Sequence, residues 1–184
     1  MFNNEIAPLK EGLMPWVGND PFVLILGTLP GDESIETGMY YQNPSNRFWS
    51  IMYSLFDGDS KEDRRTFITS HHIALWDCFK SARRFSSADK DIVVGSETPN
   101  DIIAFLHKYP TIKTIITNGS SKNPKKGYST VSAFKKYFGE LLYDKSYNII
   151  SLHQTSRSNE RYGITFEQKL QEWEIVKQII EKQL

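Results

Sequence analysis

Four short apolar runs recur along the chain, each followed by glycine or polar residues. The runs are FVLILG (22–27), IALWD (73–77), IKTIITN (112–118) and YNIISL (147–152). An unbroken apolar run of this length is typical of a strand buried on both faces, as in a parallel sheet. We therefore predict four strands of one mostly parallel sheet.

Helical patterns lie between and after these runs. Four of them fall at residues 47–56, 61–71, 102–109 and 131–138. The second follows Ser60, with Asp63 three residues on, as an imperfect capping box. Thr165 and Gln168 form a better capping box, which opens a long helix. Its apolar stripe, expected to dock on the sheet, is Phe166, Leu170, Trp173, Val176 and Ile180.

This alternation of strand and helix predicts a three-layer α/β/α domain with a short, mostly parallel, four-stranded sheet. Residues 83–100 form the longest stretch without periodicity and are expected to be a loop. In open α/β sheets, ligands bind beyond the carboxyl ends of the strands. Functional residues are therefore expected in four segments: 27–34, 77–84, 118–127 and 152–159.

The chain has 184 residues, 39% of them hydrophobic and 24% charged, which suits one globular domain spanning residues 1–184. The composition excludes disordered, collagen-like and disulfide-stapled proteins. Cys78 is the only cysteine, so no disulfide forms within the chain and a reducing compartment is expected. No apolar run reaches the roughly 20 residues of a membrane helix, and no signal-peptide core is present. We expect a cytoplasmic protein that does not associate with membranes.

The charges balance, with 22 Lys and Arg against 22 Asp and Glu. An avid, non-specific nucleic-acid binder is normally more basic than this. Local basic clusters do occur, notably Lys122, Lys125 and Lys126, and Arg157 with Arg161. Each cluster is either a solvated surface or a phosphate-binding face.

Polar residues that can carry chemistry follow the first strand in the segment GTLPGDES (27–34). Gly27 and Gly31 allow the backbone to approach a ligand closely, and Pro30 stiffens the turn. The segment matches neither the P-loop nor the dinucleotide-binding spacing. It is either a cradle for a phosphate or base, or a plain tight turn.

The segment YYQNPSNRFW (40–49) concentrates aromatic and amide side chains. Phe48 and Trp49 are expected to anchor a helix in the core. Adjacent aromatics such as Tyr40 and Tyr41 can stack on a nucleobase. Asn46 lies at a predicted helix start, where it either caps the helix or holds a water or a substrate carbonyl.

The fourth strand leads into SLHQTSRSN (151–159), whose hydroxyl and backbone N–H groups suit phosphate binding. His153 is the only histidine just beyond the carboxyl end of a predicted strand. It is either a structural residue or a functional one. The cysteine and histidine spacing predicts no zinc site.

Five segments together resemble the uracil-DNA glycosylase superfamily: VLILGTLPGDES, YYQNPSNRFW, IALWDCFKSARR, ITNG and LHQTSRSN. They resemble its hypoxanthine-DNA (deoxyinosine) glycosylase branch most, and YYxxPxNxFW also resembles the mismatch-specific uracil-DNA glycosylases. The resemblance runs from about residue 22 to the last helix. It implies a short parallel sheet flanked by helices, which agrees with the pattern above, and no cofactor or metal.

The resemblance also implies residue roles. Asn46 corresponds to the residue implicated in catalysis, Tyr41 to the aromatic that stacks on the base, and Asn118 to the position that reads the base edge. The loop that frames the flipped base corresponds to Gly27, Thr28, Leu29, Pro30 and Gly31. Thr155 and Ser156 correspond to the loop that grips the DNA backbone. Apart from the resemblance, we also assign Ser34, Arg157 and the basic cluster Lys122, Lys125 and Lys126 to the DNA backbone.

Two departures from the family pattern concern the last loop and the first. Where the branch usually has a loop of the type LPSTSPAN, this chain has LHQTSRSN, so His153 and Arg157 replace two prolines. Arg157 then supplies either a phosphate contact or a wedge. His153 approximates a catalytic histidine of other branches. The first loop has Leu29 and Pro30 where several branches have Asp or Asn, so catalysis is expected to depend on Asn46.

These observations predict a monomeric, monofunctional DNA glycosylase that acts on DNA containing a deaminated base, hypoxanthine or uracil. Its site is expected to be poor in carboxylates and to lack a lysine nucleophile. Two alternatives remain open. One is an inactive, glycosylase-like protein that binds nucleic acid. The other is a nucleotide- or nucleoside-processing enzyme on a flavodoxin-like sheet.

Overall fold

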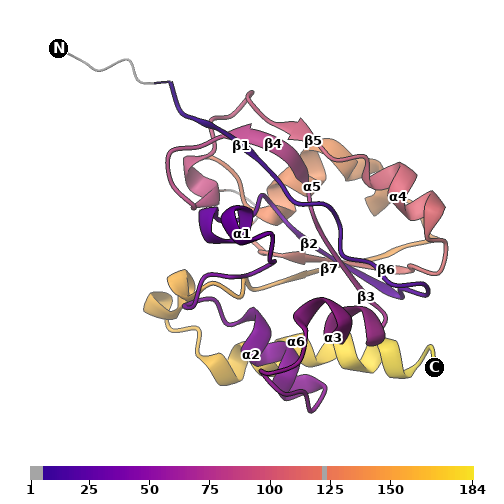
Figure 1. The fold of residues 1–184 in the computed structure, drawn as a ribbon. Helices are drawn as coiled ribbons and strands as arrows, with labels where there is room; N and C mark the ends of the chain where they lie inside the picture. The colour runs from indigo at the N-terminus through magenta and orange to yellow at the C-terminus, as the bar shows by residue number, and fades with distance from the viewer. Residues whose placement is uncertain (1–5, 122–123) are drawn as a thin grey trace.

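A four-stranded parallel sheet forms the centre of the molecule. The computed structural model describes residues 6–121 and 124–184. The strand order is β3 (Ile73–Asp77), β2 (Val23–Gly27), β6 (Thr114–Asn118) and β7 (Asn148–Leu152), and all neighbours run parallel (Figure 1). The predicted fold class and all four predicted strands are confirmed.

Helices cover both faces of this sheet. Figure 1 shows α2 (Phe48–Leu55), α3 (Arg64–Ser70) and α6 (Phe166–Glu181) below the sheet, and α4 (Ile102–Lys108) and α5 (Thr130–Phe138) above it. The side chains of β2 alternate between two cores: Val23 and Ile25 pack with α2 and α6, whereas Leu24 and Leu26 pack with α4 and α5. A strand that is buried on both faces explains the unbroken apolar run.

The last helix begins where its capping box predicts. Thr165 accepts a hydrogen bond from the N–H of Gln168, and the Gln168 side chain accepts one from the N–H of Thr165. Trp173, Val176 and Ile180 are buried, and Phe166 and Leu170 pack against the same core. The predicted stripe is confirmed.

One predicted helix starts later than expected, and one short helix was not predicted. The helix expected from residue 61 begins at Arg64, because Asp63 rather than Ser60 provides the cap, accepting from the N–H of Thr66. In the loop after β2, Asp32–Thr37 form a short helix, α1, that the pattern did not predict. It buries only Ser34 and has no side-chain cap, so it leaves little trace in the sequence.

The stretch 83–100 was expected to be a loop, but parts of it are ordered by a second sheet. This antiparallel sheet has the order β1 (Leu9–Glu11), β4 (Phe79–Arg83) and β5 (Thr98–Pro99). A 3-10 turn, η1 (Asp89–Asp91), lies within the connection. Two further 3-10 turns are η2 (Gly139–Leu142) and η3 (Arg157–Tyr162).

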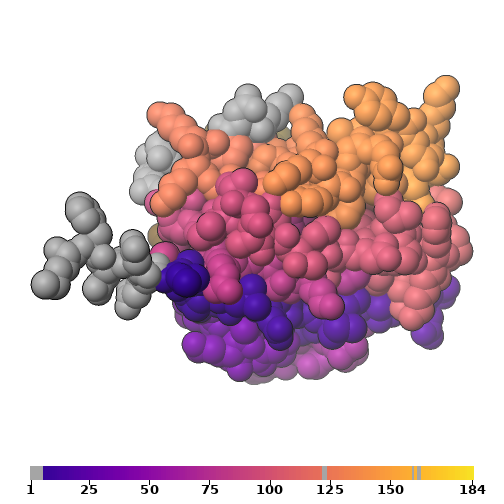
Figure 2. Space-filling view, turned by 90° about the horizontal axis from the view of Figure 1, so that it is seen from above, coloured from indigo at the N-terminus to yellow at the C-terminus, as the bar shows by residue number. Residues whose placement is uncertain are grey.

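Figure 2 looks down on the layer that holds α4, α5 and the small sheet. The magenta-to-orange part of the chain covers most of this face, with the indigo N-terminal region beside it. Among the described residues, no helix is long and apolar enough to cross a membrane.

Candidate active site

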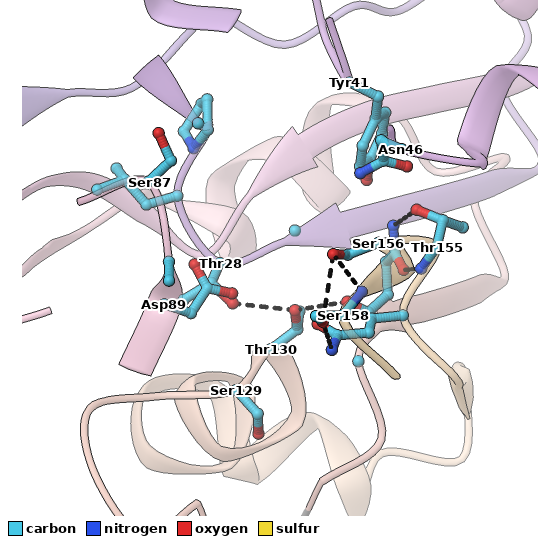
Figure 3. A pocket seen from close by; sticks show the side chains of 18 of the residues that line it. Thr28, Tyr41, Asn46, Ser87, Asp89, Ser129, Thr130, Thr155, Ser156 and Ser158 are labelled. Carbon is cyan, nitrogen blue, oxygen red and sulfur yellow. Dashed lines mark hydrogen bonds between the residues drawn. The ribbon is translucent and has the colours of Figure 1, made fainter. Parts of the chain in front are cut away.

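A pocket of about 770 Å³ opens at the carboxyl ends of the four parallel strands. Its walls come from the ends of all four, together with the loop before α2 and the turn η1. The lining includes Gly27–Gly31, Tyr40, Tyr41, Asn46, Asp77, Ser87–Lys90, Asn118–Ser121 and His153–Ser156. Figure 3 shows Tyr41 and Asn46 on one side of this space, Thr155 and Ser156 on a second, and Asp89 and Thr28 on a third. The volume suits a drug-sized or nucleoside-sized ligand.

The loop after β2 is held rigidly by its neighbours. A Cβ atom on Gly27 would overlap the Asp77 carboxylate, so only glycine fits at this strand end. The Thr28 hydroxyl is hydrogen-bonded to the Thr130 hydroxyl (3.0 Å). The guanidinium of the buried Arg84 donates to the carbonyls of Leu29 and Pro30. The loop is therefore more than a plain tight turn, because a buried cation fixes its backbone.

Gly31 and Ser34 belong to the start of α1. Gly31 is the N-cap residue of this helix, and its carbonyl accepts from the N–H of Ser34. The Ser34 side chain is buried and its hydroxyl accepts from the N–H of Gln42. Ser34 lines the pocket, but its hydroxyl is engaged within the protein.

The two adjacent tyrosines have different surroundings. Tyr40 is buried and packs edge-on against Trp16 in the core. Tyr41 has a positive φ of 54°, and one face of its ring stacks on Phe48 with centroids 3.9 Å apart. Burial and the nearby Asp77 charge raise the pKa of the Tyr41 hydroxyl well above its usual range, so the hydroxyl stays neutral. Tyr41 is thus the tyrosine placed to offer an aromatic surface to a ligand.

Asn46 has one end of its amide bonded and the other turned toward the ligand space. Its Oδ1 accepts from the N–H of Phe48 (2.9 Å), which supports the start of α2. Its Nδ2 makes no hydrogen bond within the described part of the chain, and the residue lines the pocket. The capping and the functional interpretations are therefore compatible, because Oδ1 supports the helix and Nδ2 is left for a ligand.

Asn118 and Thr155 are bonded to each other at the ends of β6 and β7. Asn118 Nδ2 donates to the Thr155 hydroxyl (3.0 Å), and Asn118 Oδ1 accepts from the Thr155 N–H (2.9 Å). Both side chains are buried. The structure brings both residues to the pocket, and it joins them in a pair that holds the two strand ends together.

His153 begins the loop after β7 and is paired with α6. Its Nδ1 lies 2.9 Å from the Glu172 carboxylate, and its carbonyl accepts from the Trp173 indole N–H. The ring is 46% exposed at the pocket. The carbonyl of Ser156 in the same loop accepts from the Lys169 ammonium (2.8 Å). Helix α6 therefore sets the conformation of this loop.

Basic side chains gather beside this loop around one carboxylate. Glu160 pairs with Arg47 (3.1 Å), with Arg157 (2.9 Å) and, at 3.7 Å, with Lys169. Lys169 is buried, so Arg47 and Arg157 are the cations of this cluster that reach the surface. Arg157 itself is 53% exposed.

Of the predicted lysine cluster, the structure describes Lys125 and Lys126. Lys125 is exposed, and Lys126 pairs with Asp91 (3.2 Å). Lys122 lies outside the described residues. The assignment of these lysines to the DNA backbone stays a prediction.

Three carboxylates line the pocket, Glu33, Asp77 and Asp89, and none was predicted as a site residue. The expectation of a carboxylate-poor site is therefore wrong. Asp77 ends β3, and burial, reinforced by the Asp89 charge, raises its pKa to about 8. Burial also raises the pKa of Asp89 to about 6, although Thr28 and Arg84 oppose this shift. An acidic residue at the end of IALWD, at a predicted ligand-binding edge, was the available signal.

No group of three or more His, Cys, Asp or Glu side chains positioned to hold a metal ion occurs within residues 6–121 and 124–184.

The chain belongs to the uracil DNA glycosylase superfamily, whose family profile matches residues 15–175. A protein named hypoxanthine DNA glycosylase from Methanosarcina acetivorans is 30% identical over 173 residues, covering 91% of this chain and 98% of that protein. A protein of the same name from Methanosarcina barkeri is 32% identical over 114 residues, covering 60% and 71% of the two chains.

The fold is also similar to that of a solved structure. An NMR structure from Methanosarcina acetivorans, provisionally described as a uracil DNA glycosylase, superposes with a TM-score of 0.71 at 28% identity. The match covers 95% of this chain and 99% of that one. The family resemblance predicted from the five sequence segments is confirmed.

Proposed function

We propose that this protein is a monofunctional DNA glycosylase that hydrolyses the N-glycosidic bond of a deaminated base, hypoxanthine or uracil. The observation that carries the proposal is the convergence of Tyr41 and Asn46 on one pocket at the strand ends. Superfamily membership and two relatives named hypoxanthine DNA glycosylase support it. The substrate is DNA, and the reaction belongs to base excision repair.

The target nucleotide must leave the duplex, because its glycosidic bond is inaccessible within the stack. A base turned into the pocket meets the free face of Tyr41, whose other face is supported by Phe48. Stacking on such a platform contributes about 1–3 kcal/mol per base. A damaged or mispaired base costs less to unstack, which favours it over normal bases.

Bond cleavage places positive charge on the sugar and negative charge on the departing base. Asn46 can position the attacking water through its unbonded Nδ2 end or the remaining lone pair of Oδ1. Polar groups fixed before the reaction stabilise such charges without reorganising. His153, held by Glu172, provides a further ring nitrogen at the pocket wall.

A monofunctional enzyme leaves an abasic site, whereas a lyase needs an amine that attacks the sugar. One lysine, Lys90, contributes to the pocket lining, which the sequence motifs did not predict. Its side chain is exposed on η1. We therefore assign it no nucleophilic role, and borohydride trapping of a covalent enzyme–DNA adduct tests this assignment: a trapped adduct would contradict it.

The function is tested with labelled oligonucleotides that contain one uracil, hypoxanthine or xanthine, in single- and double-stranded form. Incubation followed by alkali is expected to cut the strand at hypoxanthine or uracil, and incubation without alkali is expected to leave it intact. If no base is excised but the DNA is bound, the result favours the alternative of an inactive, glycosylase-like protein that binds nucleic acid. If the DNA is neither cut nor bound, a nucleotide- or nucleoside-processing enzyme becomes the better hypothesis.

A further inference from the structure

Two arginines at the rim of the pocket converge on one carboxylate. Arg47 Nε lies 3.1 Å from Glu160 Oε1, and Arg157 Nε lies 2.9 Å from Glu160 Oε2. Among the described side chains, neither guanidinium makes a hydrogen bond or an ion pair with any other group. A guanidinium group binds a phosphate with the same N–H donors that bind a carboxylate. The pair of arginines therefore has the donors of a phosphate site.

This cluster lies beside the pocket in which the base is held. Arg47 directly follows Asn46 in the chain, and its backbone N–H donates to the carbonyl of Thr155 (2.9 Å). Arg157 directly follows Ser156, the N-cap residue of η3. Asn46, Thr155 and Ser156 line the pocket (Figure 3). A nucleotide that enters the pocket keeps its flanking phosphates at the rim, because the DNA backbone is continuous.

The anion of the cluster faces three cations, of which two can meet a ligand. Hydrogen bonds from Arg157 and Arg47 lower the pKa of Glu160, although partial burial opposes the shift, so the carboxylate is ionised at neutral pH. Lys169 lies 3.7 Å from Glu160, but it is buried and donates to the carbonyl of Ser156. The side chains of Arg47 and Arg157 are 33% and 53% exposed. A ligand at this rim therefore meets the two arginines.

The two ion pairs of Glu160 with the arginines are easy to replace. Pairs between partly exposed side chains contribute little, because water and salt screen them and the side chains lose freedom. An arginine that binds a DNA phosphate gains from the release of counterions condensed on the DNA. Glu160 lies on the short turn η3 and is itself 23% exposed, so its carboxylate has access to water. Exchange of this carboxylate for a phosphate is therefore physically reasonable.

We propose that Arg47 and Arg157 form a site for one backbone phosphate of the DNA, and that Glu160 occupies this site in the free protein as a competing anion. The inference rests on the proposed glycosylase function, which supplies the DNA. Because every phosphate that enters the site must displace Glu160, this residue lowers the affinity for DNA with or without a lesion. The balance of 22 basic and 22 acidic residues agrees with a DNA-binding rim that is partly neutralised from within.

A structural role for Glu160 predicts the opposite sign. If Glu160 only holds the loop after β7 in shape, its neutralisation loosens that loop and weakens DNA binding. If Glu160 competes with phosphate, its neutralisation strengthens DNA binding. The direction of the change in affinity therefore separates the two roles.

Glu160→Gln is the principal variant, because it removes the charge and keeps the size and a hydrogen-bond acceptor. Binding of a fluorescently labelled duplex without a lesion is measured by anisotropy at several salt concentrations. At low salt, Kd is expected to fall by about 2- to 10-fold, the scale of two partly exposed ion pairs. Glu167→Gln is the matched control, since Glu167 is exposed in the first turn of α6 and has no ion pair among the described residues. This control should change Kd by less than about twofold, because a distant surface charge is screened.

Variants that lack the arginines separate displacement from general repulsion. In an Arg47→Gln/Arg157→Gln background, Glu160→Gln should no longer strengthen binding, because the groups for which Glu160 competes are gone. A gain that persists in this background shows that Glu160 merely repels DNA, and it overturns the proposed site. Arg47→Gln alone should reduce the slope of log K against log salt by about 0.9, and an unchanged slope excludes Arg47 from the site.

Thermal unfolding shows whether each variant is folded. Glu160→Gln leaves the buried Lys169 without its nearby anion, so some loss of stability is expected. If that variant does not fold, Glu160→Asp keeps a charge near Lys169 and shortens the side chain, and it should show a smaller gain in affinity. Unchanged or weaker binding by the folded variant overturns the competing role of Glu160. It leaves the glycosylase function standing, because excision by the wild type is measured separately. A wild type that neither binds nor cuts DNA overturns both.

Discussion

On the β6–β7 side of the pocket, the predicted ligand-binding side chains are bonded within the protein: Asn118 to Thr155, and His153 to Glu172. On the side formed by β2, β3 and the loop before α2, polar groups remain unbonded. Asp77 has a buried oxygen without a partner in the described chain, and Asn46 has its Nδ2 end free there. The two sides therefore differ in what they can still bind.

Hydrogen-bond satisfaction distinguishes support from recognition. A buried polar group left without a partner costs about 1–3 kcal/mol, so a fold that keeps one does so most readily where a ligand completes the bond. Bonded pairs such as Asn118–Thr155 hold the pocket in shape instead. Substitutions on the two sides should therefore have different effects: excision should suffer on the side of β2, β3 and the loop before α2, and stability on the β6–β7 side.

The largest effect is expected at Asn46. Asn46→Ala should lower the single-turnover excision rate by about 10²–10³-fold, the usual cost of removing one oriented polar group from a reacting centre. The free energy of unfolding should fall by only about 1 kcal/mol from the lost support of α2. Near-normal excision by the folded variant would eliminate the proposed mechanism.

Asn46→Asp sharpens that result, because it keeps an oxygen to accept from Phe48 and loses the Nδ2 donor. A stable but inactive Asp variant assigns catalysis to the donor end. A stable and active one assigns it to the oxygen that positions water.

Tyr41 is expected to have the next largest effect. Tyr41→Ala removes the stacking surface, which is worth roughly 1–3 kcal/mol. The variant should therefore lower kcat/KM by about 5- to 150-fold. Tyr41→Phe preserves the ring on Phe48 and should be mild. If Phe is as damaging as Ala, the hydroxyl beside Asn118 and Asp77 is what matters, and the stacking assignment is wrong.

Thr155 tests the other side of the pocket. Thr155→Val removes the hydroxyl that accepts from Asn118 and leaves a buried donor unpaired, so urea unfolding should show a loss of about 1–3 kcal/mol. Thr155→Ser keeps the hydroxyl and is the control. Excision per folded molecule should change little in both variants. A Val variant of normal stability but poor excision would show that the Asn118–Thr155 pair takes part in excision rather than stabilising the fold.

The parts of the molecule that the sequence predicts well are those governed by local patterns. Apolar runs long enough to be buried on both faces identified β2 and its neighbours, and the Thr165–Gln168 capping box located α6. Motif spacing placed Tyr41 and Asn46 at the pocket. Short elements with weak patterns, such as α1 and the small antiparallel sheet, left no comparable signal.

The site itself was predictable by residue type but not by bonding state. Asp77 stood at the end of IALWD, but its burial without a partner depends on Tyr40, Arg84 and Asp89, which reach it only through the tertiary fold. Equally, the pairing of Asn118 with Thr155 joins two strand ends that are 37 residues apart. Hydrogen-bond satisfaction is a property of the assembled core, so sequence spacing does not encode it locally.

The smallest effect is expected at Arg157, on the outer rim of the bonded side. Arg157 is exposed and shares Glu160 with Arg47 and Lys169, so its loss leaves that carboxylate paired. If it contacts a phosphate, Arg157→Ala should weaken binding to all DNA sequences and reduce the slope of log K against log salt by about 0.9. Lys145→Ala removes the same charge near the amino ends of the strands and should leave the slope unchanged. A wedge role instead predicts slower excision at constant slope, because extrusion of the base would suffer while the number of phosphate contacts stays the same. We favour the phosphate contact, since Arg157 follows two hydroxyl residues after a strand, and an unchanged slope in the salt titration of Arg157→Ala would rule it out.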